Sequence, residues 1–162
     1  MDHNMHNVEE EGFYMGLNHF ADLTEAEFKA HTGRKAKPAG ENKQYTTLPT
    51  LGLPDSVNWY TAGKVNGPKD QGSCGSCWAF SAVGAIEGVH AIASGQLLNL
   101  AEQQLVDCSH EGPKGEPNDG CDGGWEDYAI DYATTHKLEL GMDDSDTHRD
   151  GSCKYNAALG KV

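Results

Sequence analysis

The pattern of apolar and polar positions predicts helices separated by long polar connections. Between Cys77 and Ser94 the sequence reads CWAFSAVGAIEGVHAIAS, and its apolar residues cover nearly all sides of a helical wheel. A helix of that kind belongs in a protein core rather than on its surface. Ser76 is placed to cap its N-terminus and Gly95 to end it. Two further helices are predicted, over 101–108 and from about 125 to 135.

The N-terminal third of the chain is more polar. Thr24 and Glu27 have the spacing of a capping box, in which each side chain satisfies a free backbone N–H group of the other residue. A short helix is therefore predicted to begin here, and Gly33 has the position of a C-terminal stop. The following stretch to Pro54 is rich in proline and lysine and has no apolar period, so it is predicted to be an extended connector.

Charge narrows the range of partners. The chain has 162 residues, with 25 acidic and 12 basic side chains and a formal net charge of −13. This balance argues against nucleic acid or an anionic membrane surface as a partner. No uninterrupted apolar run is long enough to cross a bilayer. The polar start MDHNMHNVEEEG lacks the features of a secretory signal, so we expect either an intracellular protein or a missing leader.

Five cysteines leave several kinds of chemistry open. An odd number suggests two disulfides and one free thiol in a secreted chain, or metal or redox chemistry in a cytosolic one. A redox C-x-x-C pair should follow a strand, but VNGPKDQGS before Cys74 has the composition of turns. A structural zinc site needs two close pairs of ligands, and Cys74 and Cys77 have no second pair to match them. No metal site and no cofactor is therefore predicted.

Cys77 is also a candidate nucleophile. With Ser76 as the cap it lies in the first helical turn, where free backbone N–H groups and the helix dipole favour the reactive thiolate. The same N–H groups and the carboxamide of Gln71 could stabilise an oxyanion formed on a carbonyl group. The spacing alone does not separate this interpretation from a small buried cysteine.

Several motifs together resemble the papain and cathepsin L group of cysteine peptidases. QGSCGSCWAFSA (71–82) resembles their nucleophile segment and carries the C-G-[SA]-C-[WY] signature. LPDSVNW resembles the mature N-terminus, and EQQLVDCS, GCDGGWEDYA and DGSCKYN resemble later segments in the same order. Upstream, GLNHFADLTEAEF resembles the inhibitory propeptide. Its GxNxFxD pattern is matched by Gly16, Asn18, Phe20 and Asp22.

The resemblance implies an α+β papain-like fold. Only the mainly α-helical left lobe and a truncated propeptide would be present, and the β-barrel right lobe would be missing. Residues 1–33 would be the C-terminal part of the inhibitory propeptide, and 34–52 the extended connector with the maturation cleavage site. Residues 53–162 would be the left lobe of the peptidase domain.

The resemblance also implies roles for single residues. Cys77 would be the nucleophile, and Gln71 would form the oxyanion hole with the Cys77 backbone N–H. Substrate would bind at Gly123, Gly124, Trp125 and Glu126. Disulfides would join Cys74 to Cys121 and Cys108 to Cys153, which leaves Cys77 free.

The function implied is that of a cysteine endopeptidase precursor, lysosomal or extracellular. It would hydrolyse peptides and proteins through a thioester, with its own propeptide as the inhibitor. The family's base histidine and orienting asparagine lie about 130–150 residues after the nucleophile. Since neither is present, we expect the chain alone to be weakly active or inactive. The alternative is an inert propeptide-like inhibitor or a peptide-binding pseudo-peptidase.

Three smaller departures from the family pattern concern local structure. Ala101 stands where a serine usually caps the second helix, and Asn99 is the candidate substitute. SDTHRD (145–150) replaces an aromatic stretch, which puts the packing of this segment in question. Glu126 places a carboxylate beside a pocket that is typically apolar.

Overall fold

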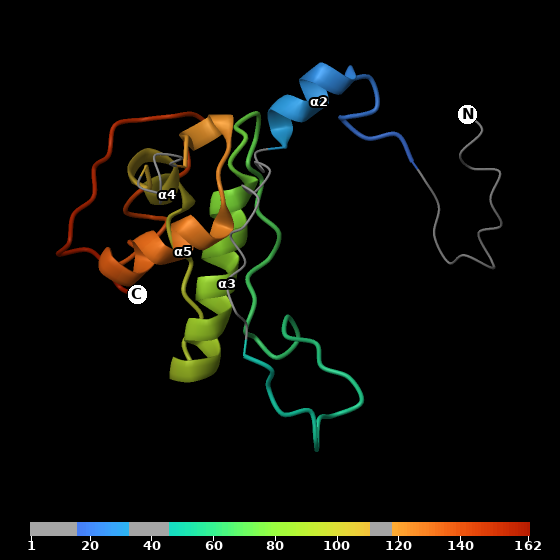
Figure 1. Ribbon diagram of the computed structural model, residues 1–162, viewed down its shortest axis with the longest axis vertical. Coiled ribbons are helices and arrows are strands. Elements are labelled where there is room, and N and C mark those ends of the chain that lie inside the picture. Colours follow the sequence, from blue (N-terminus) through green and yellow to red (C-terminus); the bar gives the residue numbers. More distant parts are fainter. Residues whose placement is uncertain (1–15, 33–45, 111–117) are drawn as a thin grey trace.

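The computed structural model describes residues 16–32, 46–110 and 118–162. Regular structure within these ranges is helical: α2 (Glu25–His31), α3 (Cys77–Ser94), α4 (Glu102–Cys108), the short 3₁₀ helix η3 (Gly120–Asp122) and α5 (Glu126–Thr135). An isolated antiparallel β-bridge pairs Leu100 with Leu140. In Figure 1, α3 runs through the centre, α4 and α5 lie beside its first half, and α2 is set apart from them.

The hydrophobic core lies where α3 packs against α4 and α5. Trp78, on the first turn of α3, and Leu105, on α4, are completely buried. Each large apolar side chain buried in this way contributes about 1.5–3 kcal/mol to folding. The core cluster consists of Cys74, Trp78, Ala79, Ala82, Val83, Leu100, Leu105, Val106, Ala129 and Leu138.

Only one face of α3 is buried, so the helix that was predicted to lie in the core rather than on the surface contributes to both. Trp78, Ala82 and Val83 lie in the core, whereas Val89 and Ile92 are 68% and 53% exposed. By length and composition alone, α3 is apolar enough to cross a membrane, a test that the core helix of a soluble protein also passes. The apolar residues on the buried face of α3 pack against α4 and α5.

The predicted ends of α3 agree with the structure, but one of the caps does not act as expected. Gly95 takes the left-handed conformation (φ 80°) and its N–H donates to Ala91 O. Such a backbone favours glycine because it has no Cβ. Ser76 stands at the N-cap position, yet its side chain makes no cap hydrogen bond and its buried Oγ has no hydrogen-bond partner.

The other predicted helices begin and end within about one residue of their expected positions. The capping box of α2 is present: Thr24 Oγ1 accepts from Glu27 N, and Glu27 Oε2 accepts from Thr24 N at 2.7 Å. The Thr24 hydroxyl also donates to Glu27 Oε2, and this hydrogen bond, together with the one from Thr24 N, lowers the pKa of Glu27. The last residue described after α2 is Thr32, so the predicted stop at Gly33 lies outside the described residues.

The start of α4 has no side-chain cap. Its N-cap residue is Ala101, and neither Ala101 nor Asn99 provides a cap hydrogen bond, so Asn99 does not substitute for the usual serine. The helix is held by tertiary contacts instead, because Leu105 and Val106 are buried in the core. The last residues of the chain are tied to the segment after α5, where Lys161 N donates to Leu138 O at 2.8 Å.

Candidate active site

Two disulfides fix the surroundings of the first turn of α3. Cys74 is bonded to Cys121 on η3, and Cys108 at the end of α4 is bonded to Cys153 in the C-terminal segment. These are the pairs that the resemblance implies. Cys77 is the free cysteine, and it is partly exposed at the first position of α3. The odd cysteine therefore stands at a helix N-terminus, where free backbone N–H groups point outward.

A tight turn leads into Cys77. The Ser76 N–H donates to Cys74 O at 2.8 Å, and the Gly75 N–H donates to Cys121 O at 3.0 Å. The Cys74–Cys121 disulfide adds a covalent link between the same two segments. The backbone before the nucleophile candidate is therefore fixed to η3 by a hydrogen bond and a covalent bond.

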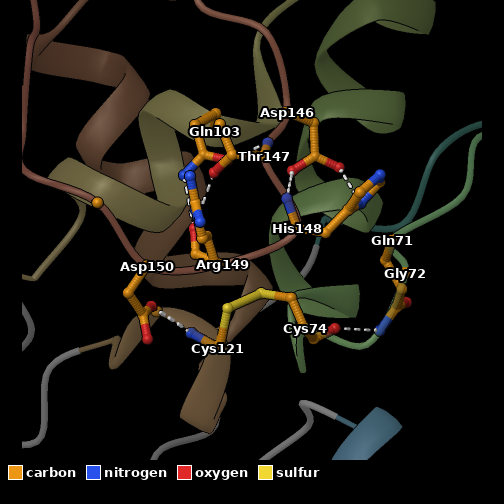
Figure 2. The surroundings of a disulfide bond; sticks show 12 residues. Gln71, Gly72, Cys74, Gln103, Cys121, Asp146, Thr147, His148, Arg149 and Asp150 are labelled. Atoms are coloured by element: carbon orange, nitrogen blue, oxygen red, sulfur yellow. Dashed lines mark hydrogen bonds and ion pairs between the residues drawn. A yellow bond between two sulfur atoms is a disulfide. The ribbon is translucent and has the colours of Figure 1, made fainter.

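The carboxamide of Gln71 lies against this turn. Its Nε2 donates to Cys74 O at 2.9 Å, as Figure 2 shows. The same nitrogen donates to His31 O, the last residue of α2, also at 2.9 Å. The His31 ring in turn lies 3.3 Å from Gly72 O. Gln71 therefore joins the entry of α3 to the end of α2.

Aromatic contacts hold the segment that precedes α2 on that helix. The Phe20 ring packs edge-on against Phe28 and His31 of α2, with centroid separations of 5.6 and 5.5 Å. Asn18 Oδ1 accepts from Phe20 N at 3.0 Å and so shapes the turn. Two of the four residues of the GxNxFxD pattern thus have a visible structural role.

The segment that contains Gly123 and Gly124 lies next to α3. Trp78, the residue after Cys77, donates from its indole Nε1 to Gly120 O at 3.0 Å. A Cβ on Gly124 would lie 2.8 Å from Trp78 Cδ2, closer than real side chains come. Trp125 is buried and Glu126, the first residue of α5, is partly exposed. The structure thus brings four of the predicted substrate-binding residues to the same end of α3 as Cys77.

Sequence reasoning missed a cluster of buried charged side chains, which consists of Lys69, Glu87 and Glu102. Lys69 Nζ donates to Glu87 Oε1 on α3 at 2.9 Å and to Glu102 Oε1 on α4. Burial alone would lower the pKa of Lys69, but its hydrogen bonds to the two carboxylates outweigh burial and raise it. Burial raises the pKa of Glu102 despite its contact with Lys69.

The same cluster connects the chain before α3 to α4. Glu87 Oε2 accepts from Asn66 Nδ2 at 2.8 Å, and Glu87 Oε1 accepts from Leu100 N at 2.8 Å. The Glu87 side chain is only 3% exposed. A glutamate in an otherwise apolar helix was the one signal in the sequence that could have indicated this cluster, since a buried carboxylate needs partners.

The segment that replaces the usual aromatic stretch is held by one buried glutamine. Gln103 Oε1 accepts from Thr147 N at 2.7 Å, and Gln103 Nε2 donates to Arg149 O at 3.0 Å. Figure 2 shows these contacts beside the Cys74–Cys121 disulfide, with the Asp150 carboxylate accepting from Cys121 N. In this segment the Gln103 side chain thus makes hydrogen bonds with the backbone of Thr147 and Arg149.

Three histidine rings within the described ranges contact groups other than Cys77. The His110 ring lies between Asp107 O and Asn118 O, His136 stacks on Tyr132, and His148 Nδ1 lies 2.9 Å from Asp146. In the same ranges no group of three or more His, Cys, Asp or Glu side chains is arranged to hold a metal ion. Cys77 itself presents a free thiol at the N-terminus of α3.

The fold described above is that of the papain-like class. The family model described as "Papain family cysteine protease" matches residues 53–162, and the chain belongs to that family. The resemblance seen in the sequence and the papain-like fold are confirmed. The helices described here correspond to the mainly helical lobe that was expected.

Individual relatives agree with this assignment. The chain is 44% identical to Cysteine protease 1 of Oryza sativa subsp. japonica, over 99% of this chain and 33% of that protein. It is 40% identical to Procathepsin L of Mus musculus, over 94% of this chain and 46% of that protein. The chain therefore spans a third to a half of these curated relatives.

Solved structures extend the comparison to the N-terminal segment. The digestive procathepsin L2 proteinase from Tenebrio molitor larval midgut matches with a TM-score of 0.78 and 33% identity, over 96% of this chain and 52% of that chain. A recombinant stem bromelain precursor matches with a TM-score of 0.76 and 29% identity, over 98% and 52% of the two chains. The chain thus spans about half of each solved precursor.

Proposed function

We propose that this chain is part of the precursor of a cysteine endopeptidase, with Cys77 as the nucleophile. The observation that carries the proposal is the state of Cys77: it is the one cysteine outside the two disulfides, and it is partly exposed at the N-terminus of α3. The thiolate sulfur would attack the carbonyl carbon of a peptide bond and form a thioester as the amine leaves. Water would then release the acyl group and restore the thiol.

The oxyanion of that reaction would be held by the Gln71 carboxamide and the Cys77 backbone N–H. Gln71 is anchored to Cys74 O, which lies in the turn leading to Cys77. Because its Nε2 also donates to His31 O, the end of α2 already occupies a donor that the oxyanion would use. This contact supports a self-inhibiting role for the N-terminal segment.

The division of the chain into functional parts belongs to the same proposal. Residues 1–33 would be the inhibitory propeptide, 34–52 the connector with the maturation cleavage site, and 53–162 the first half of the peptidase domain. The family match over 53–162 and the match of the whole chain to precursor structures support these boundaries. Two disulfides favour an oxidising compartment, consistent with a lysosomal or extracellular enzyme.

Substrate would lie in an extended conformation along Gly123 and Gly124, with Trp125 and Glu126 beside its side chains. The acid–base histidine of the family lies about 130–150 residues beyond the nucleophile. Without it the leaving amine has no proton donor. The chain alone should therefore react at Cys77 but turn over peptides slowly.

Labelling and hydrolysis measured on the same preparation test the proposal. After cleavage within 34–52 has released the N-terminal segment, a peptide-based thiol-directed inhibitor should modify Cys77 faster than iodoacetamide does, relative to free cysteine, while hydrolysis of a fluorogenic peptide stays weak. Cys77→Ser should abolish the labelling, with the two disulfides intact. The proposal fails if the peptide-based reagent shows no such preference, or if a whole papain-like enzyme is inhibited by a chain whose Cys77 cannot be labelled. The second result would identify an inert inhibitor instead.

A further inference from the structure

A single buried side chain organises the loop that carries Gly123 and Gly124. Asn118 is 1% exposed, and both ends of its carboxamide are hydrogen-bonded. Its Nδ2 donates to Ser109 Oγ at 3.1 Å, and its Oδ1 accepts from Trp125 N at 2.7 Å. Ser109 is itself fully buried directly after α4. The Asn118 side chain therefore connects the end of α4 to the residue that precedes α5.

The two ends of the loop are drawn together around this carboxamide. The N–H of Asp119, next to Asn118, donates to Gly123 O at 2.9 Å. Trp125, on the far side of the two glycines, is held by Asn118 Oδ1. The backbone at Gly123 and the backbone at Trp125 are thus both fixed from the Asn118 side of the loop. Gly124 lies between these two fixed points.

Gly124 is packed directly on the same carboxamide. A Cβ on Gly124 would lie 2.5 Å from Asn118 Oδ1 and 2.8 Å from Trp78 Cδ2. Trp78 follows Cys77 on α3 and is completely buried. The distance of the Gly124 backbone from the nucleophile helix is therefore set by contact with one side chain of α3 and one side chain of the loop.

Asn118 is in turn anchored to a rigid part of the molecule. The backbone oxygen of Asn118 lies 3.3 Å from His110 Nδ1. The other ring nitrogen of His110 lies 2.9 Å from Asp107 O on α4. Ser109 N donates to Leu105 O at 2.9 Å, which continues the backbone hydrogen bonds of α4. Asn118 therefore holds the segment with Gly123 and Gly124 in a fixed position relative to α4.

We propose that Asn118 is a positioning residue for substrate binding. The Asn118 carboxamide fixes the distance of the Gly123–Gly124 backbone from α3. At this distance, a peptide bound along the two glycines presents a carbonyl carbon to Cys77. This inference rests on the proposed function, in which these glycines bind the substrate backbone. A peptide held by backbone hydrogen bonds tolerates displacements of only about 0.5 Å, and a misplacement of about 1 Å can lower reactivity about 100-fold. Asn118 itself touches no reacting atom.

Two thiol reagents separate positioning from folding. Iodoacetamide reports on the thiol of Cys77 alone, whereas a peptide-based epoxide must also bind along Gly123 and Gly124. Asn118→Leu keeps the shape of the side chain and removes both hydrogen bonds. We expect it to lower the labelling rate of the chain cleaved within 34–52 by the peptide epoxide about tenfold, and to change the iodoacetamide rate less than about twofold.

Three further variants make the comparison decisive. Asn118→Asp keeps an oxygen for Trp125 N and can accept from the Ser109 hydroxyl. Its ratio of the peptide-epoxide rate to the iodoacetamide rate should therefore be close to that of the unsubstituted chain. Ser109→Ala removes one of the two hydrogen bonds and should reduce the preference less than Asn118→Leu does. Leu138→Ala, a truncation in the core, should weaken folding and leave the ratio of the two rates unchanged.

Each outcome bears on one of the two proposals. If the unmodified chain has no preference for the peptide reagent, the proposed function fails. If that preference exists and Asn118→Leu retains it in full, the positioning role is wrong while the proposed function stands. If Asn118→Leu does not fold, as judged by circular dichroism, an unchanged ratio in Ser109→Ala overturns the positioning role. A ratio that falls equally in Leu138→Ala and Asn118→Leu also overturns it.

Discussion

Close contacts at single positions account for much of the site. Gly124 faces Asn118 and Trp78 so closely that no side chain fits there. Glycine is required at this position because the buried side chains of Asn118 and Trp78 approach its backbone. The backbone conformation is not the reason, because φ of Gly124 is not positive. The doublet Gly123–Gly124 was noticed in the sequence through the family resemblance. The neighbours that make Gly124 necessary come from segments 6 and 46 positions away along the chain.

Gly124→Ala should destabilise the protein by about 1–3 kcal/mol, the usual range for forcing a methyl group into a packed region. Gly84→Ala is the matched control, because a Cβ at Gly84 on α3 meets nothing within 4 Å. There the same substitution should stabilise the protein by about 0.5–1 kcal/mol through helix propensity. Urea denaturation of both variants measures the two effects. Equal changes in free energy of unfolding would show that packing at Gly124 is not the cause.

Among the elements, the helices show which local signals suffice and which do not. The capping box of α2 and the glycine at the end of α3 both act as their sequence patterns predict. Ser76 occupies the predicted N-cap position without making the cap hydrogen bond. Ala101 begins α4 with an extended backbone (φ −87°, ψ 107°) and no cap. A helix start can therefore be fixed by tertiary packing even where its side-chain cap is missing.

Ala101→Ser should stabilise α4. A serine Oγ at the N-cap position can accept from the N–H of the second or third helical residue, which contributes about 1 kcal/mol. Ala101 is fully buried, so the added hydroxyl also depends on that hydrogen bond for its satisfaction. Ala82→Ser is the control, since Ala82 is also buried but lies beyond the first turn of α3, where the backbone N–H groups are hydrogen-bonded within the helix. Thermal unfolding should show a gain for the first variant and a loss for the second. A loss for both would mean that the hydroxyl finds no partner at Ala101.

For the molecule as a whole, the fold is held by connections between distant segments. The Lys69 ammonium group bridges α3 and α4 through two carboxylates, and two disulfides join the helices to the loops around them. Removing one partner of a buried ion pair leaves an uncompensated charge and destabilises a protein by about 3–5 kcal/mol.

Lys69→Met should destabilise the protein strongly at neutral pH, by about 3 kcal/mol or more, because Glu87 and Glu102 would face each other without a cation. Burial already raises the pKa of Glu102. A carboxyl group with a raised pKa in the folded state binds its proton more readily there than in the unfolded chain, so it favours folding as the pH falls through that range. Part of the lost stability should thus return between neutral pH and about pH 4.

Lys64→Met provides the comparison for Lys69. Lys64 Nζ donates to Ala91 O at 2.8 Å, near the end of α3, without a carboxylate partner. Its loss should lower stability by about 1 kcal/mol, with little dependence on acid pH. Denaturant unfolding at neutral pH and near pH 4 distinguishes the two variants. A pH-independent loss for Lys69→Met would contradict the role of the Glu102 carboxyl.

The sequence by itself determined the family, the bounds of the helices and the identity of the candidate nucleophile. Those features depend on short-range signals: the capping box at Thr24, the glycine stop at Gly95 and the motif around Cys77. Helix periodicity and caps act within a few residues, so they can be recognised in a linear pattern.

Only the tertiary structure decided which face of α3 is buried, how Lys69 is neutralised and what holds Gly124 in place. Each depends on groups far apart in the chain, such as Asn118 and Trp78 on either side of Gly124. A helix that is apolar all round gives no indication of which side will be covered. A buried asparagine looks like any other loop residue until its partners, Ser109 and Trp125, are placed around it. Burial and hydrogen bonding are properties of the packed chain, and so they appear only when it is folded.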